Sequence, residues 1–225
     1  MESRAIFTSR HTGKSNAPYN SRNLALHVGD NEELVRGNRR DLAAELGVLP
    51  ERLFFMEQTH GIEVVMIDEK SDNWLTVSCD AMITRTSGTA LAVMVADCAP
   101  LLLVGEHTTA AIHVGWRGLF DGIVEKVIDL MAGERFHALI GPTICGKCYR
   151  IGEDLHHKAQ QREFITGVDT LDIPQSILKI LRNESGTSLI SSQWNGICTF
   201  ESADHYSYRR DGITGRQAGV VIHGS

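Results

Sequence analysis

This sequence lacks the features that mark several large classes of proteins. Its 22 Lys and Arg residues are scattered among 28 Asp and Glu residues, and the formal net charge is −6. A chain without a basic stripe is not expected to bind nucleic acid. No segment is long and apolar enough to span a bilayer, and residues 1–7 contain no apolar core of signal-peptide length. We therefore expect a cytoplasmic protein whose partners are small molecules, with neither nucleic acid nor membrane among them.

Signs of a divided or repetitive chain are also absent. The 225 residues contain no internal repeat, low-complexity tract or linker, and a chain of this length and apolar content can bury a substantial core by itself. A single domain over residues 1–225 is therefore expected. No heptad pattern or long amphipathic seam requires a second copy, so we expect a monomer. No G-x-G-x-x-G segment follows a predicted strand, which leaves a dinucleotide-binding domain without support.

Cysteine occurs in an odd number, which argues against a disulfide framework. The five cysteines are Cys79, Cys98, Cys145, Cys148 and Cys198. Cys145 and Cys148 form a C-x-x-C pair, but the chain has no second such pair to complete a structural zinc site. The pair therefore predicts a loop with two ordinary thiols. Histidines in H-x-H pairs, which are frequent in multicopper oxidases, are absent as well.

Hydrophobic periodicity predicts an α+β fold. A helix is expected over residues 30–45, with Asp30 as its N-cap and Gly47 at its end. After a short first strand, apolar runs predict strands at 53–57, 62–67, 81–84, 89–96, 100–104, 109–114, 136–140 and 219–222. Further helices are expected at 119–131, at 152–163 and from Pro174 onwards. Because helices lie both between and after the strands, we expect mixed β-sheets rather than a regular doubly wound sheet.

Three residues stand at the ends of strand-like runs, where a rigid scaffold can hold a metal ligand. They are His60, Cys98 and His113, in the segments Q-T-H-G, A-D-C-A-P and H-V-G-W-R-G. Neutral imidazole and thiolate are good zinc ligands, and three protein ligands leave a fourth position for water, as in catalytic sites. Two other interpretations use the same residues. Either Cys98 is a small buried hydrophobe and the histidines end strands, or Cys98 is a nucleophile with His113 or His60 as its base.

The segments that contain these residues resemble one bacterial family. QTHG at 58–61, ADCAPLLL at 96–103 and HVGWRGL at 113–119 look like blocks of the laccase-domain or polyphenol oxidase proteins. That family is regarded as zinc-dependent purine nucleoside phosphorylases with adenosine deaminase activity. The resemblance extends over nearly the whole chain, through the segments NLALHVGD at 23–30, GPTI at 141–144 and SYRRDGITGR at 207–216.

The resemblance implies a fold, a cofactor and a reaction. It implies a layered α/β/β/α arrangement in which His60, Cys98 and His113 bind Zn²⁺. The implied reaction is phosphorolysis of adenosine, inosine or methylthioadenosine to the base and ribose 1-phosphate, with deamination of adenosine as a second activity. Copper is expected only as an adventitious substitute, because divalent copper outcompetes zinc at most nitrogen and sulfur sites. A copper-loaded polyphenol oxidase, with weak laccase-like activity, is the corresponding alternative.

Phosphorolysis also requires a phosphate held against the anomeric carbon, for which an arginine fork is well suited. Arg117, at the expected start of a helix, is the first candidate. Asp97 could orient a ligating histidine or take a proton, although alternation along an extended chain would point it away from Cys98. Candidates for binding the substrate are Arg22, Asn23 and His27, with Arg209, Arg210 and Arg216 behind them.

Two further hypotheses compete with the phosphorylase. The first is a metal-independent cysteine hydrolase, with Cys98 as nucleophile and His113 as base. The second is a nucleoside- or metal-binding protein without turnover, which would be stabilised by its ligand and release no product.

The chain departs from the family pattern at Arg150, where the family tends to carry an acidic residue, and at Cys145 and Cys148, which replace more variable positions.

Overall fold

The computed structural model describes residues 2–72 and 77–224. Its strands are β1 (Arg4–Phe7), β2 (Leu53–Glu57), β3 (Val64–Ile67), β4 (Val77–Ser78), β5 (Ala81–Thr84), β6 (Ala90–Val95), β7 (Ala99–Gly105), β8 (Thr109–Val114), β9 (Phe136–Ile140), β10 (Leu189–Trp194) and β11 (Gln217–Ile222). Its α-helices are α1 (Glu32–Leu46), α2 (Trp116–Asp121), α3 (Ile123–Leu130), α4 (Glu153–Gln161), α5 (Ile173–Glu184) and α6 (Tyr208–Asp211). Short 3-10 helices occur at Leu26–Val28, Pro50–Arg52 and Gly186–Ser188.

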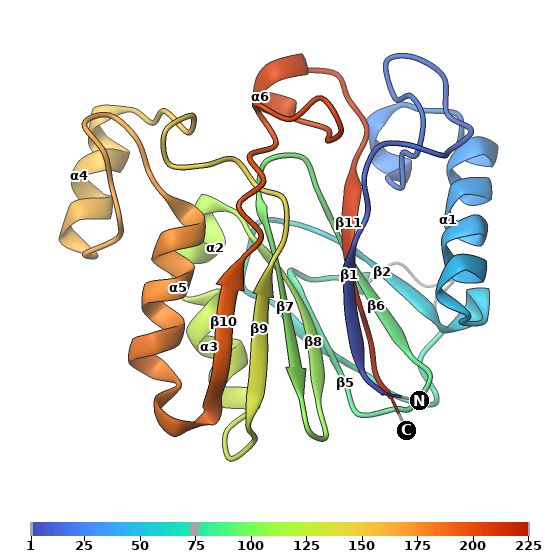
Figure 1. Cartoon of the computed structure of the whole chain (residues 1–225), viewed down its shortest axis with the longest axis horizontal. Coiled ribbons are helices and arrows are strands. Elements are labelled where there is room, and N and C mark those ends of the chain that lie inside the picture. The colour runs from blue at the N-terminus through green and yellow to red at the C-terminus, as the bar shows by residue number, and fades with distance from the viewer. Residues whose placement is uncertain (1, 73–76, 225) are drawn as a thin grey trace.

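These elements form four layers, with two mixed β-sheets in the middle (Figure 1). The five-stranded sheet has the order β1-β11-β6-β2-β4, and the six-stranded sheet has the order β10-β9-β7-β8-β5-β3. Helix α1 packs on the outer face of the first sheet, while α2, α3 and α5 pack on the outer face of the second. The predicted α+β class and the α/β/β/α layering are confirmed.

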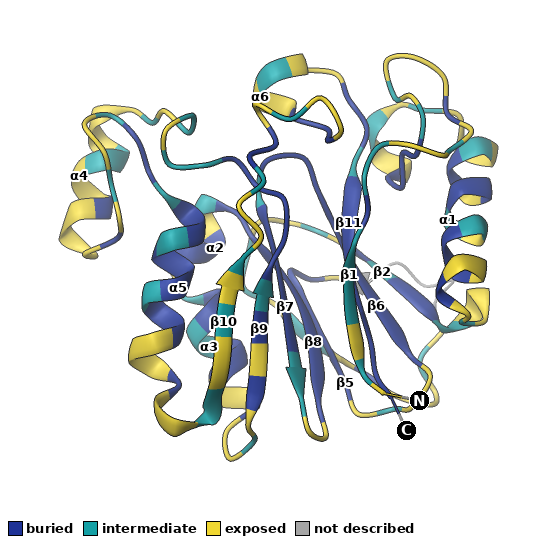
Figure 2. Cartoon of the chain, viewed as in Figure 1, coloured by how far each residue is buried: buried dark blue, intermediate teal, exposed yellow. Residues whose placement is uncertain are grey.

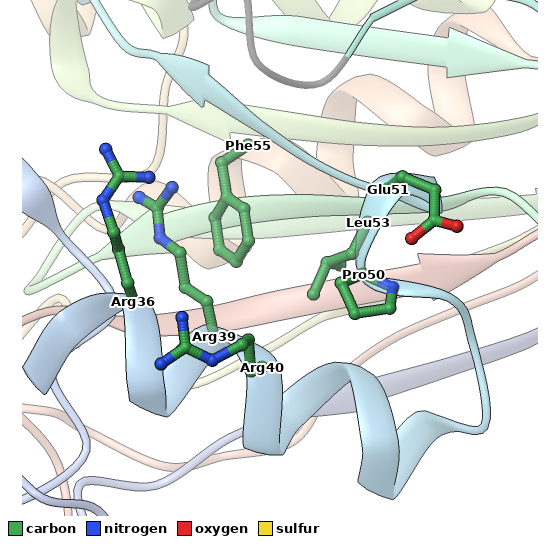
Figure 3. Close-up of a pocket in the computed structure, with 7 residues that line it drawn as sticks. All are labelled: Arg36, Arg39, Arg40, Pro50, Glu51, Leu53 and Phe55. Carbon is green, nitrogen blue, oxygen red and sulfur yellow. The ribbon is translucent and has the colours of Figure 1, made fainter. Parts of the chain in front are cut away.

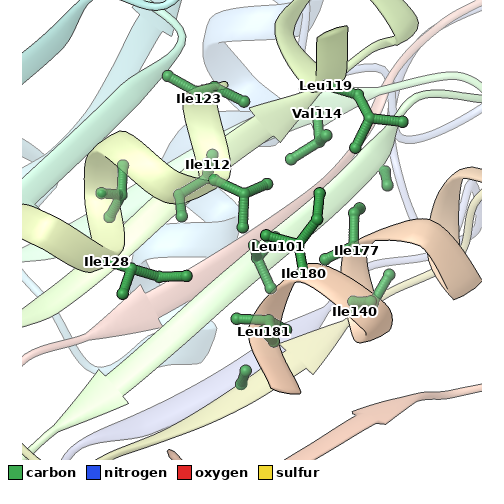
Figure 4. Close-up of a cluster of buried hydrophobic side chains, with 14 of the residues drawn as sticks. Leu101, Ile112, Val114, Leu119, Ile123, Ile128, Ile140, Ile177, Ile180 and Leu181 are labelled. Atoms are coloured by element: carbon green, nitrogen blue, oxygen red, sulfur yellow. The ribbon is translucent and has the colours of Figure 1, made fainter. Parts of the chain in front are cut away.

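Buried apolar side chains fill the three spaces between these layers. The space between the sheets contains Phe54, Leu91 and Leu102, and Figure 4 shows the cluster between the six-stranded sheet and its helices, with Leu101 and Ile177. Strands β6 and β8 are buried along their whole length, and β7 over most of it (Figure 2). These are the continuous apolar runs that are typical of central strands covered on both faces.

Most predicted elements are present, several with bounds that differ by one or two residues, and there are three larger differences. The N-cap of α1 is Asn31 rather than Asp30, because the Asn31 side chain accepts the backbone N–H groups of residues 33 and 34. Gly47 ends α1 with a φ of 67°, as predicted. The predicted helix over 119–131 begins earlier and is interrupted at Gly122, whose φ of 87° separates α2 from α3. Strands β4 and β10 and helix α6 were not predicted.

A membrane-crossing helix is not found in the part of the chain that the structure describes, because no helix there is both long and apolar enough.

Candidate metal centre and active site

The three predicted ligands meet at one end of the six-stranded sheet. Cys98 precedes β7 and His113 lies near the end of β8, and the antiparallel register pairs Pro100 with His113. His60 comes from the loop between β2 and β3. The ligand nitrogen and sulfur atoms of the three residues lie within 4.8 Å of one another. Since zinc binds such atoms at about 2.0–2.3 Å, small movements of these side chains would place all three around one ion.

Gly115 leaves open the space beside these ligands. A methyl group at this position would lie 3.1 Å from Cδ2 of His60, 3.3 Å from Sγ of Cys98 and 3.8 Å from Cε1 of His113. The φ of Gly115 is −82°, which any residue can adopt. Its backbone conformation therefore does not require glycine, and the missing side chain keeps free the space that the three ligands face.

Asp80, directly before β5, holds two of the ligands in place. Its Oδ1 accepts hydrogen bonds from Nδ1 of His113 at 2.7 Å and from the backbone N–H of His60 at 2.9 Å. Its Oδ2 accepts the N–H groups of Thr59 and Gly61. Burial raises the pKa of the Asp80 carboxyl, but the hydrogen bonds from His113, Gly61 and Thr59 outweigh it and hold the pKa well below its usual range. With Nδ1 of His113 donating to Asp80, Nε2 is left for a metal ion.

Asp97 has a different position from the one that the sequence suggested. Its carboxylate accepts a hydrogen bond from Oγ1 of Thr199 at 2.6 Å and one from the backbone N–H of Arg209 at 2.6 Å. The contact to a ligating histidine is instead made by Asp80, which the sequence analysis did not single out. The available signal was a carboxylate at the start of a buried strand, where an unpaired charge would be strongly destabilising.

Two residues of the site have a left-handed backbone conformation. The φ angles are 61° at His60 and 96° at Asp97. Such angles are uncommon outside glycine, and they concentrate at functional sites. At Asp97 the positive φ also interrupts the extended geometry that would point this residue away from Cys98. As a result, Asp97 and Cys98 both line the same cavity.

The electrostatic environment favours the form of Cys98 that binds a metal. Burial raises the pKa of its thiol, but the charge of His113 and hydrogen bonds from His113 and His60 outweigh this and lower the pKa to about 6. Burial lowers the pKa of His113, whereas the Cys98 thiolate and Asp80 raise it to about 9. Both shifts favour a thiolate–imidazolium pair when no metal is bound, and metal binding would displace the Nε2 proton of His113.

A cavity of about 310 Å³ opens beside the three ligands, at the lower end of the range of roughly 300–1,000 Å³ that small-molecule sites occupy. Its lining residues are His27, Gln58, His60, Met94, Val95, Ala96, Asp97, Cys98, His113, Tyr149, Tyr208, Arg209 and Arg216. The wall thus combines the candidate metal ligands with two cationic and two aromatic side chains.

The two arginines of the wall are held by backbone carbonyls and lie over the two tyrosines. Nη1 of Arg209 donates to the carbonyl of Arg150 at 2.9 Å, and its guanidinium carbon lies 4.9 Å from the ring centroid of Tyr149. Nη1 of Arg216 donates to the carbonyls of the two preceding residues, and its guanidinium carbon lies 5.9 Å from the ring centroid of Tyr208. Both cations are therefore held next to the cavity.

The other predicted arginines lie outside the cavity lining. Arg117 is exposed, and its guanidinium carbon lies 4.3 Å from the ring centroid of Trp116. Arg22 forms an ion pair with Glu45. Arg210 donates to backbone carbonyls of the loop that precedes α6. Helix α2, which Arg117 was expected to open, has only 6 residues.

Asn23 and His27, the other two predicted substrate ligands, have separate positions. Oδ1 of Asn23 accepts the backbone N–H of Arg216 at 2.9 Å, and its Nδ2 donates to Asp30. Asn23 therefore holds the backbone of Arg216 and does not itself line the cavity. His27 does line it. Burial, followed by the charges of Arg216 and Arg39, lowers the pKa of His27, so its ring is neutral at pH 7.

Tyr149 and Tyr208 line the cavity but were not predicted as site residues, although Tyr208 lies within the segment at 207–216 that resembles the family. Burial, together with the Cys98 thiolate, raises the pKa of Tyr149 to about 12. Its hydroxyl is therefore protonated at neutral pH and available as a hydrogen-bond donor. Nothing in the local periodicity marks either residue, because Tyr149 comes from a loop and Tyr208 from the start of the short helix α6, and only the fold brings them together.

A second concavity lies between α1 and β2, and its lining carries three arginines (Figure 3). Its lining residues are Arg36, Arg39, Arg40, Pro50, Glu51, Leu53 and Phe55. The guanidinium carbon of Arg39 lies 3.9 Å from the ring centroid of Phe55, and burial, with the charge of Arg36, lowers the pKa of Arg39 to about 10. This concavity contains none of the predicted site residues, so we consider the cavity at Cys98 the candidate active site.

The fold and the site together define a class of protein, a layered α+β domain whose two-histidine, one-cysteine centre opens into a cavity with cationic and aromatic walls. The chain belongs to the family described as multi-copper polyphenol oxidoreductase laccase, whose model matches residues 4–224. The family that the sequence motifs resemble is therefore confirmed.

Several relatives of known name are similar over almost their whole length. A purine nucleoside phosphorylase of Corynebacterium glutamicum is 39% identical over 232 residues, covering 97% of this chain and 93% of that protein. Purine nucleoside phosphorylase YfiH of Escherichia coli is 33% identical over 236 residues, with coverages of 96% and 92%.

Solved structures with the same fold are also found. A Neisseria meningitidis protein of family DUF152 superposes with a TM-score of 0.88 at 30% identity, covering all of this chain and 95% of that one. YlmD of Geobacillus stearothermophilus superposes with a TM-score of 0.86 at 28% identity, with coverages of 99% and 92%.

Proposed function

We propose that this chain is a zinc-dependent purine nucleoside phosphorylase that also deaminates adenosine. The observation that carries the proposal is the convergence of His60, Cys98 and His113 at a cavity with two arginines in its wall. The names of the relatives support the same reaction, since several are called purine nucleoside phosphorylase. The substrates would be inorganic phosphate and a purine nucleoside such as adenosine, inosine or methylthioadenosine.

The residues present fit a catalytic zinc ion. Imidazole and thiolate are both zinc ligands, and three protein ligands leave one coordination position open, as in catalytic sites. When bound, the ion would supply Lewis-acid polarisation of a substrate oxygen. Asp80 holds the ring of His113 in the ligating tautomer, and Gly115 leaves the space in front of the three ligands clear. The four-coordinate geometry of this class of site is therefore compatible with the side chains of the chain.

Phosphate binding falls to the arginines of the cavity wall in this proposal. Arg209 and Arg216 present planar forks that match phosphate geometry. Asp97 and Asn23 act as positioning residues, because each accepts the backbone N–H of one of these arginines. Arg117, the first candidate from the sequence, would add positive charge outside the cavity lining and attract the anion over a longer range.

The purine nucleoside would occupy the part of the cavity between the tyrosines and His27. Aromatic rings of Tyr149 and Tyr208 offer faces for stacking on a purine. The neutral ring of His27 and the protonated hydroxyl of Tyr149 can form hydrogen bonds to ribose or base without adding charge. For deamination, adenine would be bound with its amino-bearing carbon towards the metal centre, as zinc deaminases require for attack by an activated water.

A second candidate function is supported by the closeness of Cys98 and His113, where a lowered thiol pKa and a raised imidazole pKa favour a thiolate–imidazolium pair. Such a pair is also the arrangement of a cysteine hydrolase, in which the thiolate attacks a carbonyl and the histidine protonates the leaving group. A copper oxidase has less support. Two histidines and one cysteine can also bind a single copper ion, but the two groups of potential ligands found among the described residues contain no more than two histidines, too few for the additional histidine-rich cluster of a multicopper oxidase.

The deciding experiment combines metal analysis with an assay of adenosine and phosphate. Protein purified without an affinity tag should hold one more zinc ion per chain than the Cys98→Ala variant. It should release adenine only when phosphate is present, and chelation should abolish that release until zinc is restored. Inosine formation, measured in the same samples, tests deamination. Full activity after complete removal of the metal would contradict the proposal and favour Cys98 as a nucleophile.

A further inference from the structure

A second group of metal-binding side chains lies outside the cavity. It consists of Cys145, Cys148, Cys198 and Glu201, whose sulfur and carboxylate oxygen atoms lie within 4.8 Å of one another. None of the four lines the cavity at Cys98. From the sequence, the C-x-x-C pair lacked partners, because no second pair exists. The fold provides a third thiol and a carboxylate from a segment distant in the chain.

The topology brings these two segments together. Strands β9 and β10 are parallel neighbours, so the segments that follow them leave the same edge of the sheet. Backbone hydrogen bonds then join the two segments: the N–H of Thr143 donates to Ile197 and the N–H of Thr199 donates to Thr143, both at 3.1 Å. The N–H of Cys145 also points at Sγ of Cys198, at 3.4 Å. The sulfur atoms are therefore brought together by the backbone.

The C-x-x-C segment is itself a tight turn. The N–H of Cys148 donates to the carbonyl of Cys145 at 3.0 Å, which brings the two thiols to the same side. Gly146 lies against Asp172, the N-cap of α5, so closely that a methyl group there would come within 2.5 Å of Cβ of Asp172. The turn thus has little freedom to move away from Cys198.

We propose that Cys145, Cys148, Cys198 and Glu201 bind a second zinc ion, in a closed structural site. Three thiolates and one carboxylate supply four ligands, the number that structural zinc sites use, whereas the centre at Cys98 has three and an open position. Soft thiolates select zinc over magnesium or calcium. The three thiol protons are released to solvent as the metal–sulfur bonds form. Arg210, which donates to carbonyls of the Cys198 loop, offsets part of the remaining negative charge.

This second ion would stabilise one wall of the active-site cavity. Thr143 and Ile144, directly before Cys145, donate to the backbone carbonyl of Asp97. Oγ1 of Thr199, directly after Cys198, donates to the carboxylate of Asp97. Joining the two segments through a metal therefore fixes Asp97, which in turn holds the backbone of Arg209. The site is a positioning device and takes no part in bond making.

Zinc counting tests the site separately from the proposed activity. Elemental analysis of tag-free protein, purified under reducing conditions, should give two zinc ions per chain. Cys98→Ala and Cys198→Ser should each hold one, and the combined variant none. Cys79→Ala, which removes a buried thiol outside both groups, should keep two. Equal zinc in wild type and Cys198→Ser would overturn the second site, whatever the Cys98→Ala variant shows.

Two further measurements distinguish loss of the second zinc site from failure of a variant to fold. Cobalt added to the metal-free Cys98→Ala protein should give a strong thiolate-to-metal charge-transfer absorption that Cys198→Ser in the same background lacks. Intact mass after alkylation of the denatured, chelated wild-type protein should show five modified cysteines. A mass lower by two hydrogens, with two thiols protected, would mean a disulfide in the cluster and would overturn the zinc site. Absence of the cobalt band in folded Cys98→Ala protein would overturn it as well.

Discussion

Asp80 determines how His113 presents its imidazole ring to the metal centre. The carboxylate is fully buried and accepts one hydrogen bond from the ring and three from backbone N–H groups of the 59–61 loop. It therefore fixes a ligand on β8 and the loop that carries His60 at the same time. A carboxylate behind a ligating histidine also raises the basicity of the ring and stabilises its bond to the metal.

Replacing Asp80 with Asn should weaken zinc binding by about 10–100-fold, the range found for such outer partners of metal ligands. An amide has only one accepting oxygen and turns N–H groups towards backbone donors, so part of the network must break. Competition with a chromogenic chelator measures the affinity. Asp129→Asn, at an exposed position on α3, is the control and should leave it unchanged. An unchanged zinc affinity in Asp80→Asn would show that this carboxylate does not support metal binding through His113 and the His60 loop.

Gly115→Ala should also weaken zinc binding, for a steric reason. The added methyl group would lie 3.1 Å from His60 and 3.3 Å from Cys98, so one of these ligands must shift. Gly152→Ala is a matched control, because both glycines are N-caps in extended conformation, and nothing lies within 4 Å of a methyl group at Gly152. Both variants should lose similar helix-cap stability. Only Gly115→Ala should need less chelator to lose its metal, and equal behaviour of the two would contradict the steric argument.

The convergence of His60, Cys98 and His113 could be expected from the sequence, because each ends or follows an apolar run and lies in a distinctive segment of the chain. The roles of Asp80 and Tyr149 could not, because they depend on which loops the topology brings together. Arg117 shows that closeness to a site residue in the sequence does not place a side chain in the cavity lining. It follows His113 closely in sequence, yet its side chain turns onto Trp116 and stays outside the cavity lining, while Arg209 and Arg216 arrive from the other end of the chain.

Among the elements, the pair of α2 and α3 depends on one glycine. Apolar positions at helical spacing continue across Gly122, so periodicity predicted one helix where there are two. Strand β10 was missed for the opposite reason. Its sequence LISSQW interrupts its apolar residues with two serines and a glutamine, since it forms an edge of the six-stranded sheet and is partly exposed. Strand β8 was predicted with its observed bounds, and β6 and β7 to within one residue at each end, because burial on both faces requires a continuous apolar run.

Gly122→Ala should therefore destabilise the protein by about 1–2 kcal/mol, since an L-residue is strained in the left-handed conformation that this glycine adopts. Gly37→Ala, in the interior of α1, should instead stabilise by roughly 0.5–1 kcal/mol. Its methyl group would make only ordinary contact, at 3.4 Å, with the flexible Lys14 side chain. Urea unfolding of the two variants and wild type gives both values. Destabilisation of the same size in both would show that φ at Gly122 is not the cause.

At the scale of the whole molecule, the core between the sheets joins the two halves of the fold. Strand β7 contributes to two cores at once, with Leu102 towards the other sheet and Leu101 and Leu103 towards the helices. The candidate centre takes His60 from the connection between β2 and β3 and Cys98 from the connection between β6 and β7, each of which runs from the five-stranded to the six-stranded sheet, and it takes His113 from β8. Its geometry therefore depends on how the sheets pack.

Leu102→Ala should lower the free energy of unfolding by about 2–5 kcal/mol, because the side chain is fully buried and its removal leaves a cavity. For a chain of this size, each kcal/mol corresponds to a fall of about 2–4 °C in Tm. Leu130→Ala is the control, since Leu130 is 50% exposed and should change stability by no more than about 0.5 kcal/mol. Calorimetry of the zinc-free proteins should show one cooperative transition that moves as a whole. If the sheets unfolded independently, Leu102→Ala would instead show two transitions, and its zinc affinity would stay unchanged although its free energy of unfolding is lower.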